Sequence, residues 1–86
     1  MGLSNDEMGT LGRDLVSNGA TAKLFLGLGR DYMADGDMRS AAVAYRNALT
    51  AISAMQPSDI SRMMEDRAHQ GLQSALMWLI AERILQ

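Results

Sequence analysis

A turn signal between two helical patterns is the feature that most constrains what this chain can fold into. Apolar side chains recur at helical spacing from residue 22 to 34 and again from 37 to 55, and Asp35-Gly36-Asp37 separates the two patterns. Gly36 can adopt the left-handed conformation that ends a helix, and Asp37 can accept a hydrogen bond from the free amides that open the next one. The sequence therefore predicts two antiparallel helices joined by a tight turn.

Small and large residues alternate where these two helices would cross. Gly29 and Ala41 are small, so the backbones can approach to the 8–10 Å or so of close helix packing. Tyr32 and Tyr45 would then fill the space beside that contact.

The same residues resemble a known repeat. They fall at the spacing of the tetratricopeptide repeat, a signature of about 34 residues that forms a helical hairpin. The match covers about residues 22–55 and departs from the family at Phe25, where Trp is preferred, and at Ser53, where Pro is preferred. The resemblance implies a packed repeat core made of Phe25, Leu28, Gly29, Tyr32, Gly36, Ala41, Tyr45 and Ala48.

Two further helices are expected to flank the hairpin. A short helix over 5–17 would have Ser4 as its N-cap and would stop at Ser17-Asn18-Gly19, after which Thr21 would cap the next helix. Without the family's proline at Ser53, the helix from 37 is expected to continue to Met55.

A long last helix over 58–85, capped by Ser58 after Pro57, would cover the hairpin with its apolar face. The predicted fold is therefore a single all-α domain over 1–86: a tetratricopeptide-like antiparallel hairpin with a short N-terminal helix and a long C-terminal capping helix.

Composition narrows the function classes. The chain has no cysteine, and its 10 acidic and 8 basic residues give a net charge of −2 without a run of either sign, which argues against a nucleic-acid or membrane partner. The longest apolar run, 75–81, is far shorter than the roughly 20 residues that span a bilayer. The first residues do not resemble a targeting segment, so a cytoplasmic location is expected.

Enzymatic motifs are weak. The one histidine, His69, falls on the polar side of the last helix with no cysteine for it to activate, and Asp35 and Asp37 are better explained as helix caps than as calcium ligands. The sequence predicts a protein that is not an enzyme and needs no cofactor or metal.

The end of the last helix is a candidate interface, because beyond Leu76 it is apolar almost all round. Either another chain covers this end, with Trp78 as the anchor, or the 5–17 helix folds back over it. The candidate interface residues are Trp78, Leu79, Ile80, Ile84 and Leu85.

The resemblance implies a second candidate, because in this family the inner surface of the first helix carries the ligand contacts. Leu26 and Met33 would grip an apolar side chain, while Lys23 and Arg30 would meet carboxylates. The alternative is an ordinary solvated face. The residues of the family's carboxylate clamp are not present. The positions of this candidate partner-binding groove are Lys23, Leu26, Arg30, Met33 and Ala34.

These observations favour protein binding without chemistry. The chain is expected to act as a small adaptor or chaperone that shields a helical segment of a partner, and in architecture it is similar to the small tetratricopeptide-like chaperones of bacterial type III secretion systems. The alternative is a self-association module, in which the apolar C-terminal helix pairs with its own copy as a dimer. A helix-turn-helix DNA binder is disfavoured, because the 37–55 helix offers only Arg39 and Arg46.

Overall fold

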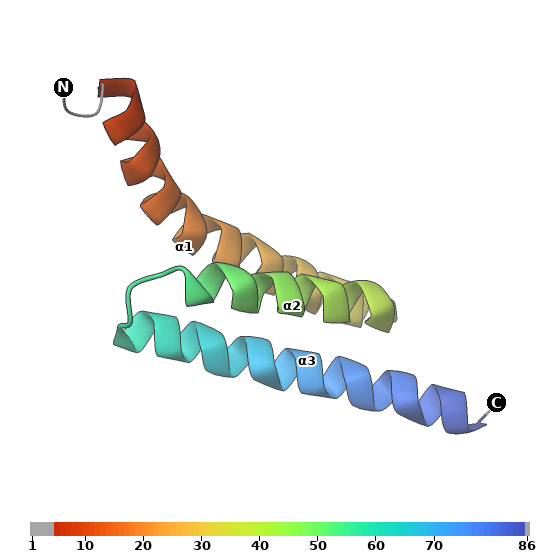
Figure 1. Ribbon diagram of the computed structural model, residues 1–86. Coiled ribbons are helices and arrows are strands. Elements are labelled where there is room, and N and C mark those ends of the chain that lie inside the picture. Colours follow the sequence, from red (N-terminus) through yellow and green to blue (C-terminus); the bar gives the residue numbers. More distant parts are fainter. Residues whose placement is uncertain (1–4, 86) are drawn as a thin grey trace.

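Helices are the only regular secondary structure in the described part of the chain, which contains no strand. The computed structural model describes the backbone of residues 5–85 and the side chains of residues 18–85. Its helices are α1 (Asn5–Ala34), α2 (Met38–Ser53) and α3 (Asp59–Leu85), and α2 packs against both of the others (Figure 1). The predicted all-α fold and the antiparallel hairpin of α1 and α2 are confirmed. The molecule is elongated, with extents of 62 × 23 × 18 Å.

The N-terminal region differs from the prediction. The separate helices expected over 5–17 and 22–34 are one continuous helix of 30 residues, and Thr21 lies inside it instead of capping a new one. Serine, asparagine and glycine without a proline weaken a helix by only about 1 kcal/mol each, so packing can override them. Here Asn18 and Gly19 are half-buried and Ala22 is fully buried, so a break would expose backbone amides where α1 meets the rest of the fold. The predicted Ser4 cap lies outside the described residues.

The turn between α1 and α2 follows the sequence prediction. Gly36 has φ = 82°, and the amide of Asp37 donates to the Tyr32 carbonyl at 2.8 Å. The Asp37 carboxylate accepts a hydrogen bond from the Ser40 amide at 3.1 Å. Hydrogen bonding by the side chain of Ser40, and then by its amide, lowers the pKa of that carboxyl. One left-handed glycine and one N-cap therefore reverse the chain.

Helix α2 ends two residues earlier than predicted, at Ser53, with Ala54 as its C-cap. The Ser53 hydroxyl donates to the Thr50 carbonyl at 2.7 Å, and the Ala54 amide turns to the Ala51 carbonyl at 3.2 Å. The serine thus occupies the acceptor that the next helical amide would have used, and the helix ends there without a proline.

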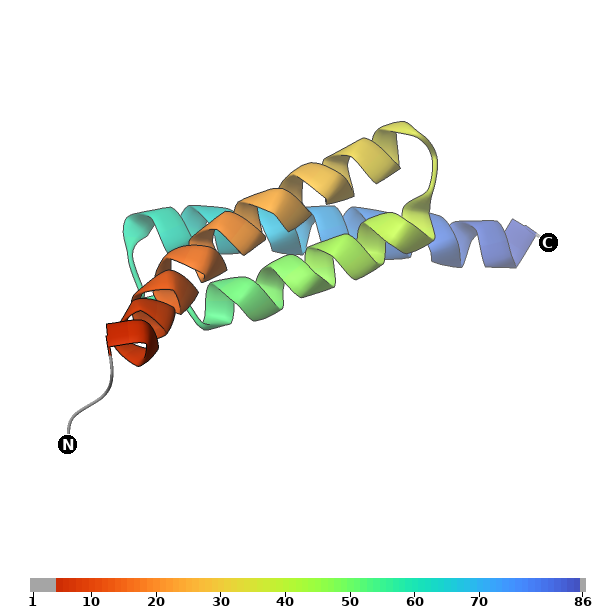
Figure 2. The same cartoon turned by 90° about the horizontal axis from the view of Figure 1, so that it is seen from above.

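Helix α3 starts as predicted, behind a Ser58 N-cap. The Ser61 amide donates to the Ser58 hydroxyl at 3.0 Å, and the Ser58 amide donates to the Ser61 hydroxyl at 2.8 Å. The helix then runs unbroken to Leu85, and its C-terminal end projects past the α1–α2 turn (Figure 2).

The core is built around α2 and consists mostly of small residues. Tyr45, 7% exposed, lies between α1 and α3, and a Cβ added at Gly29 would come within 2.8 Å of its ring. Among the predicted repeat-core residues, Gly29, Ala41, Tyr45 and Ala48 are buried and Gly36 is exposed in the turn. Three more are half-buried: Phe25, Leu28 and Tyr32.

Candidate functional site

A groove lies between α1 and α3. Helix α2 packs closely against both, whereas α1 and α3 touch each other much less, and Tyr45 of α2 lines the space between them. The groove has a volume of about 720 Å³. From α1 it is lined by Lys23, Leu26, Gly27 and Arg30, and from α3 by Ile60, Met63, Met64, Arg67, Gln70, Gly71 and Ser74.

The α3 wall of the groove carries large apolar side chains that face solvent. Ile60 is 64% exposed and Met63 is 58% exposed, whereas the neighbouring Met64 is 7% exposed and belongs to the core. Adjacent exposed apolar residues on one helix face are a mark of an interaction surface.

The groove is positively charged, although the chain as a whole is negative. Lys23, Arg30 and Arg67 line it and no carboxylate does. Among residues 18–85 the one close contact between a basic and an acidic side chain joins Glu65 and His69, at 3.6 Å. None of the three cations forms an ion pair with a carboxylate in that range.

Tyr45 connects the groove to the core. Burial raises the pKa of its phenol, and the positive charge of Arg30 partly opposes this rise. Arg30 and Tyr45 line the same groove.

Three of the five residues implied by the family resemblance lie in this groove: Lys23, Leu26 and Arg30. The other two do not line it. Met33 is half-buried and packs against the core, and Ala34 is exposed at the last position of α1.

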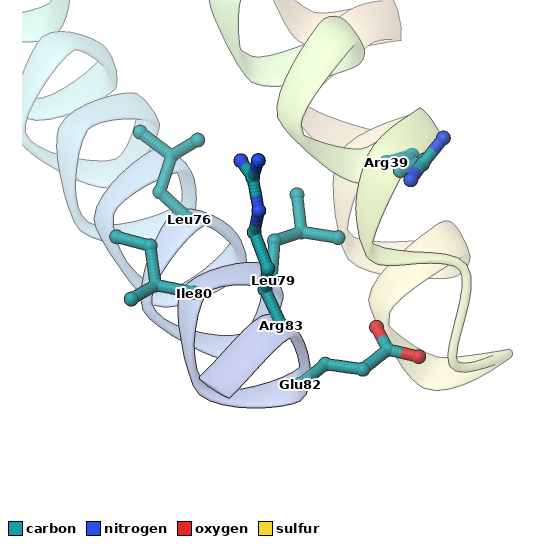
Figure 3. A pocket seen from close by; sticks show the side chains of 6 residues that line it. All are labelled: Arg39, Leu76, Leu79, Ile80, Glu82 and Arg83. Atoms are coloured by element: carbon teal, nitrogen blue, oxygen red, sulfur yellow. The ribbon is translucent and has the colours of Figure 1, made fainter. Parts of the chain in front are cut away.

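The apolar end of α3 presents two separate faces, although the sequence suggested one. Trp78 and Leu85 line a shallow hollow with Met77, Ala81 and Glu82. Leu79 and Ile80 line another, on the side of α2, with Leu76, Arg39, Glu82 and Arg83 (Figure 3). Successive residues of a helix turn by about 100°, so Trp78 and Ile80 point about 160° apart.

The residues at this end of α3 also differ in solvent exposure. Trp78 and Ile80 are 60% and 59% exposed, and Ile84 is exposed but lines neither hollow. Leu79 is half-buried against the core. The described N-terminal turns of α1 lie at the opposite end of the molecule, so the alternative in which residues 5–17 cover Trp78 is wrong (Figures 1 and 2).

Sequence reasoning did not place Ile60 and Met63 in a groove, because it treated the apolar face of the last helix as the one that covers the hairpin. The available signal was their spacing with Arg67, at i, i+3 and i+7, which sets these three on one side of the helix.

The described residues contain no group of three or more side chains suited to holding a metal ion, and no helix among them is long and apolar enough to cross a membrane. His69 is exposed on α3 beside Glu65.

No family model, curated protein or solved structure matches this chain.

Proposed function

We propose that this protein is a non-enzymatic protein-binding module that holds a helical segment of another protein in the groove between α1 and α3. The observation that carries the proposal is the groove wall itself, where Ile60 and Met63 are more than half exposed beside three cations that no described carboxylate pairs. Covering such apolar side chains removes them from water, which is the main favourable term in association.

The shape of the groove favours a helix as the ligand. Helices α1 and α3 run in the same direction (Figure 1), and residues of both line the groove. A third helix laid between them can pack its apolar stripe against Leu26 from one side and Met63 from the other, in the helix-in-groove mode of recognition. An extended peptide would need backbone partners, and the backbone of these helices is already hydrogen-bonded internally.

The resemblance to the tetratricopeptide family supports the same reading. In that family the first helix of a repeat supplies inner-surface contacts, and α3 follows the hairpin in the place where a further first helix would stand. A lone repeat cannot bury a continuous core, so completion by a partner is expected. The proposed role is that of a small cytoplasmic adaptor or chaperone.

Photo-crosslinking tests this proposal. A benzoyl-phenylalanine is placed at Met63, in the groove, or at Gln73, an exposed position of α3 that lines no hollow, in cells that make the protein. We expect one covalent adduct with another protein from position 63 and none from position 73. The same adducts from both positions, or none from either, would contradict the proposal.

A second candidate function is self-association through the hollow that Leu76 and Ile80 of α3 form with Arg39 of α2. Leu76 and Ile80 are 43% and 59% exposed there, and their hollow holds Arg39 and Arg83 together with Glu82 (Figure 3). Such a mixed patch is self-complementary, because a two-fold axis can set the carboxylate of one copy against a guanidinium of the other.

Light scattering over a wide concentration range tests this alternative. A dimer that Ile80→Arg converts to a folded monomer would support it. A monomer at every concentration would exclude it and leave the groove as the functional surface.

A further inference from the structure

The groove and the Trp78 hollow lie along one line of α3. Eighteen residues make about five full helical turns, so residues 18 apart point in the same direction. Ile60 and Met63, in the groove, are each followed 18 positions later by a residue of the hollow. The matching pairs are Ile60 with Trp78, Met63 with Ala81, and Arg67 with Leu85.

We propose that these two parts form one continuous binding surface, and that its occupant is an amphipathic helix of a partner protein that is acidic over one half of its length. This inference rests on the proposed function and adds the chemistry of the partner. Since α3 runs unbroken from Asp59 to Leu85, the surface is about 38 Å long at about 1.5 Å per residue. It matches a partner helix of about 25 residues.

The charges on this surface are segregated. Its groove half carries Lys23, Arg30 and Arg67, whereas the hollow carries one charged residue, Glu82. A matching helix therefore places carboxylates where it passes between α1 and α3, and apolar or uncharged residues where it passes Glu82. Complementary charges set the orientation of the helix and exclude basic competitors.

A second copy of the chain fits this surface less well. The stripe from Ile60 to Leu85 includes one carboxylate, Glu82, against three cations along the groove. Two copies packed in parallel through this stripe would set the cations of one copy against those of the other. In antiparallel packing the three cations of each copy would face the hollow of the other copy, where Glu82 is the one carboxylate, so most of the cations would be buried without a partner at a cost in free energy. The hollow that Leu76 and Ile80 form with Arg39 is the better candidate for pairing between copies.

Trp78 is the natural anchor at the far end. It is 60% exposed, and a large aromatic side chain that becomes buried on binding commonly dominates interface energies. It is also the one tryptophan of the chain, so its fluorescence reports on this position alone.

The test uses two synthetic helical peptides of about 25 residues that lack tryptophan and share the same leucine and alanine face. Along one half of its length, the polar face of the first peptide carries glutamates and that of the second carries lysines. The polar face of the other half is uncharged in both peptides. We expect the glutamate peptide to bind and to shift Trp78 emission to shorter wavelength, and the lysine peptide to bind at least about tenfold more weakly.

Two matched variants locate the charge effect. Arg67→Glu should lower the affinity for the glutamate peptide by about fivefold or more, because it reverses a charge in the groove. Arg62→Glu makes the same change on the same helix but outside the groove, and should leave the affinity unchanged.

Four outcomes would overturn the inference. Equal binding of both peptides would show that charge is not required. A glutamate peptide that perturbs the Met63 methyl resonance without changing Trp78 emission would show that the groove and the Trp78 hollow are two separate surfaces. A dimer that Arg67→Glu dissociates would make a second copy the occupant. Binding of neither peptide, with a partner still crosslinked at position 63, would reject the inference and leave the proposed function standing.

Discussion

Gly71 of α3 lies directly against the aromatic ring of Tyr45 from α2, so closely that a Cβ at position 71 would fall within the van der Waals envelope of the ring. Gly29 of α1 contacts the same ring. The ring of Tyr45 is thus held between two glycines on different helices, and it sets the distance between α1 and α3. The width of the groove therefore depends on this one side chain.

Gly71→Ala should destabilise the fold by about 1–3 kcal/mol, although alanine is the better helix former by about 1 kcal/mol. The added methyl must displace the Tyr45 ring, and Gly29 prevents the ring from moving towards α1. Urea unfolding followed by circular dichroism measures the change.

Gly27→Ala is the matched control for this prediction. A Cβ at position 27 meets nothing within 4 Å, so the variant should be as stable as the natural protein or up to about 1 kcal/mol more stable. Equal stability of the Gly71→Ala and Gly27→Ala variants would show that Tyr45 is not clamped as described.

Met64 and Met63 are neighbours in the sequence with opposite environments. Met64 is 7% exposed in the core, so Met64→Ala should cost about 2–5 kcal/mol of unfolding free energy. Met63 is 58% exposed in the groove, so Met63→Ala should change stability by less than about 0.5 kcal/mol. Thermal unfolding of the two variants compares them directly, and similar losses would mean that the face of α3 in the core is assigned wrongly.

The sequence predicted those parts of the fold that depend on local chemistry. The turn at Gly36, the Asp37 cap and the Ser58 cap each use a side chain within three residues of the backbone that it satisfies. The helix break expected at Ser17-Asn18-Gly19 is absent. Burial of Ala22 and its neighbours stabilises a continuous α1 through tertiary contacts, and these contacts cannot be read from the local sequence pattern.

The sequence predicted only part of the candidate site, because the rest of the site also depends on tertiary packing. Lys23, Leu26 and Arg30 were expected from the resemblance of one helix to the tetratricopeptide repeat, and they line the groove. Ile60 and Arg67 could not be assigned to the groove, because the direction in which α3 faces depends on its packing against α2. The sequence established that α3 is apolar, and the packing decides which apolar residues stay exposed.

The Tyr45 phenol should ionise above its ordinary pKa of 10.0, because burial disfavours the charged form. A group whose folded-state pKa is raised retains its proton longer in the folded state than in the unfolded state. The contribution of Tyr45 to the free energy of unfolding is therefore present below a pH of about 10, and it is lost as the pH rises through the folded-state pKa. Titration of absorbance at 295 nm in a Tyr32→Phe variant, where Tyr45 is the remaining tyrosine, measures it.

Arg30 provides the control for the titration. Its charge lowers the pKa of Tyr45, so Arg30→Gln should move the titration further upward, whereas Arg39→Gln at the far end of the hairpin should not. An unshifted titration in the Tyr32→Phe protein would mean that the phenol is exposed to water.

Trp78 and Ile80 should separate partner binding from self-association, because they point about 160° apart on α3. Both are more than half exposed, so Trp78→Ala and Ile80→Arg should each change unfolding free energy by less than about 0.5 kcal/mol. Trp78→Ala should lower affinity for the glutamate peptide by about tenfold or more, and Ile80→Arg should leave it unchanged. Conversely, any dimer seen by light scattering should be lost in Ile80→Arg and kept in Trp78→Ala. Loss of both properties in both variants would mean that the two faces work as one surface, as the sequence alone suggested.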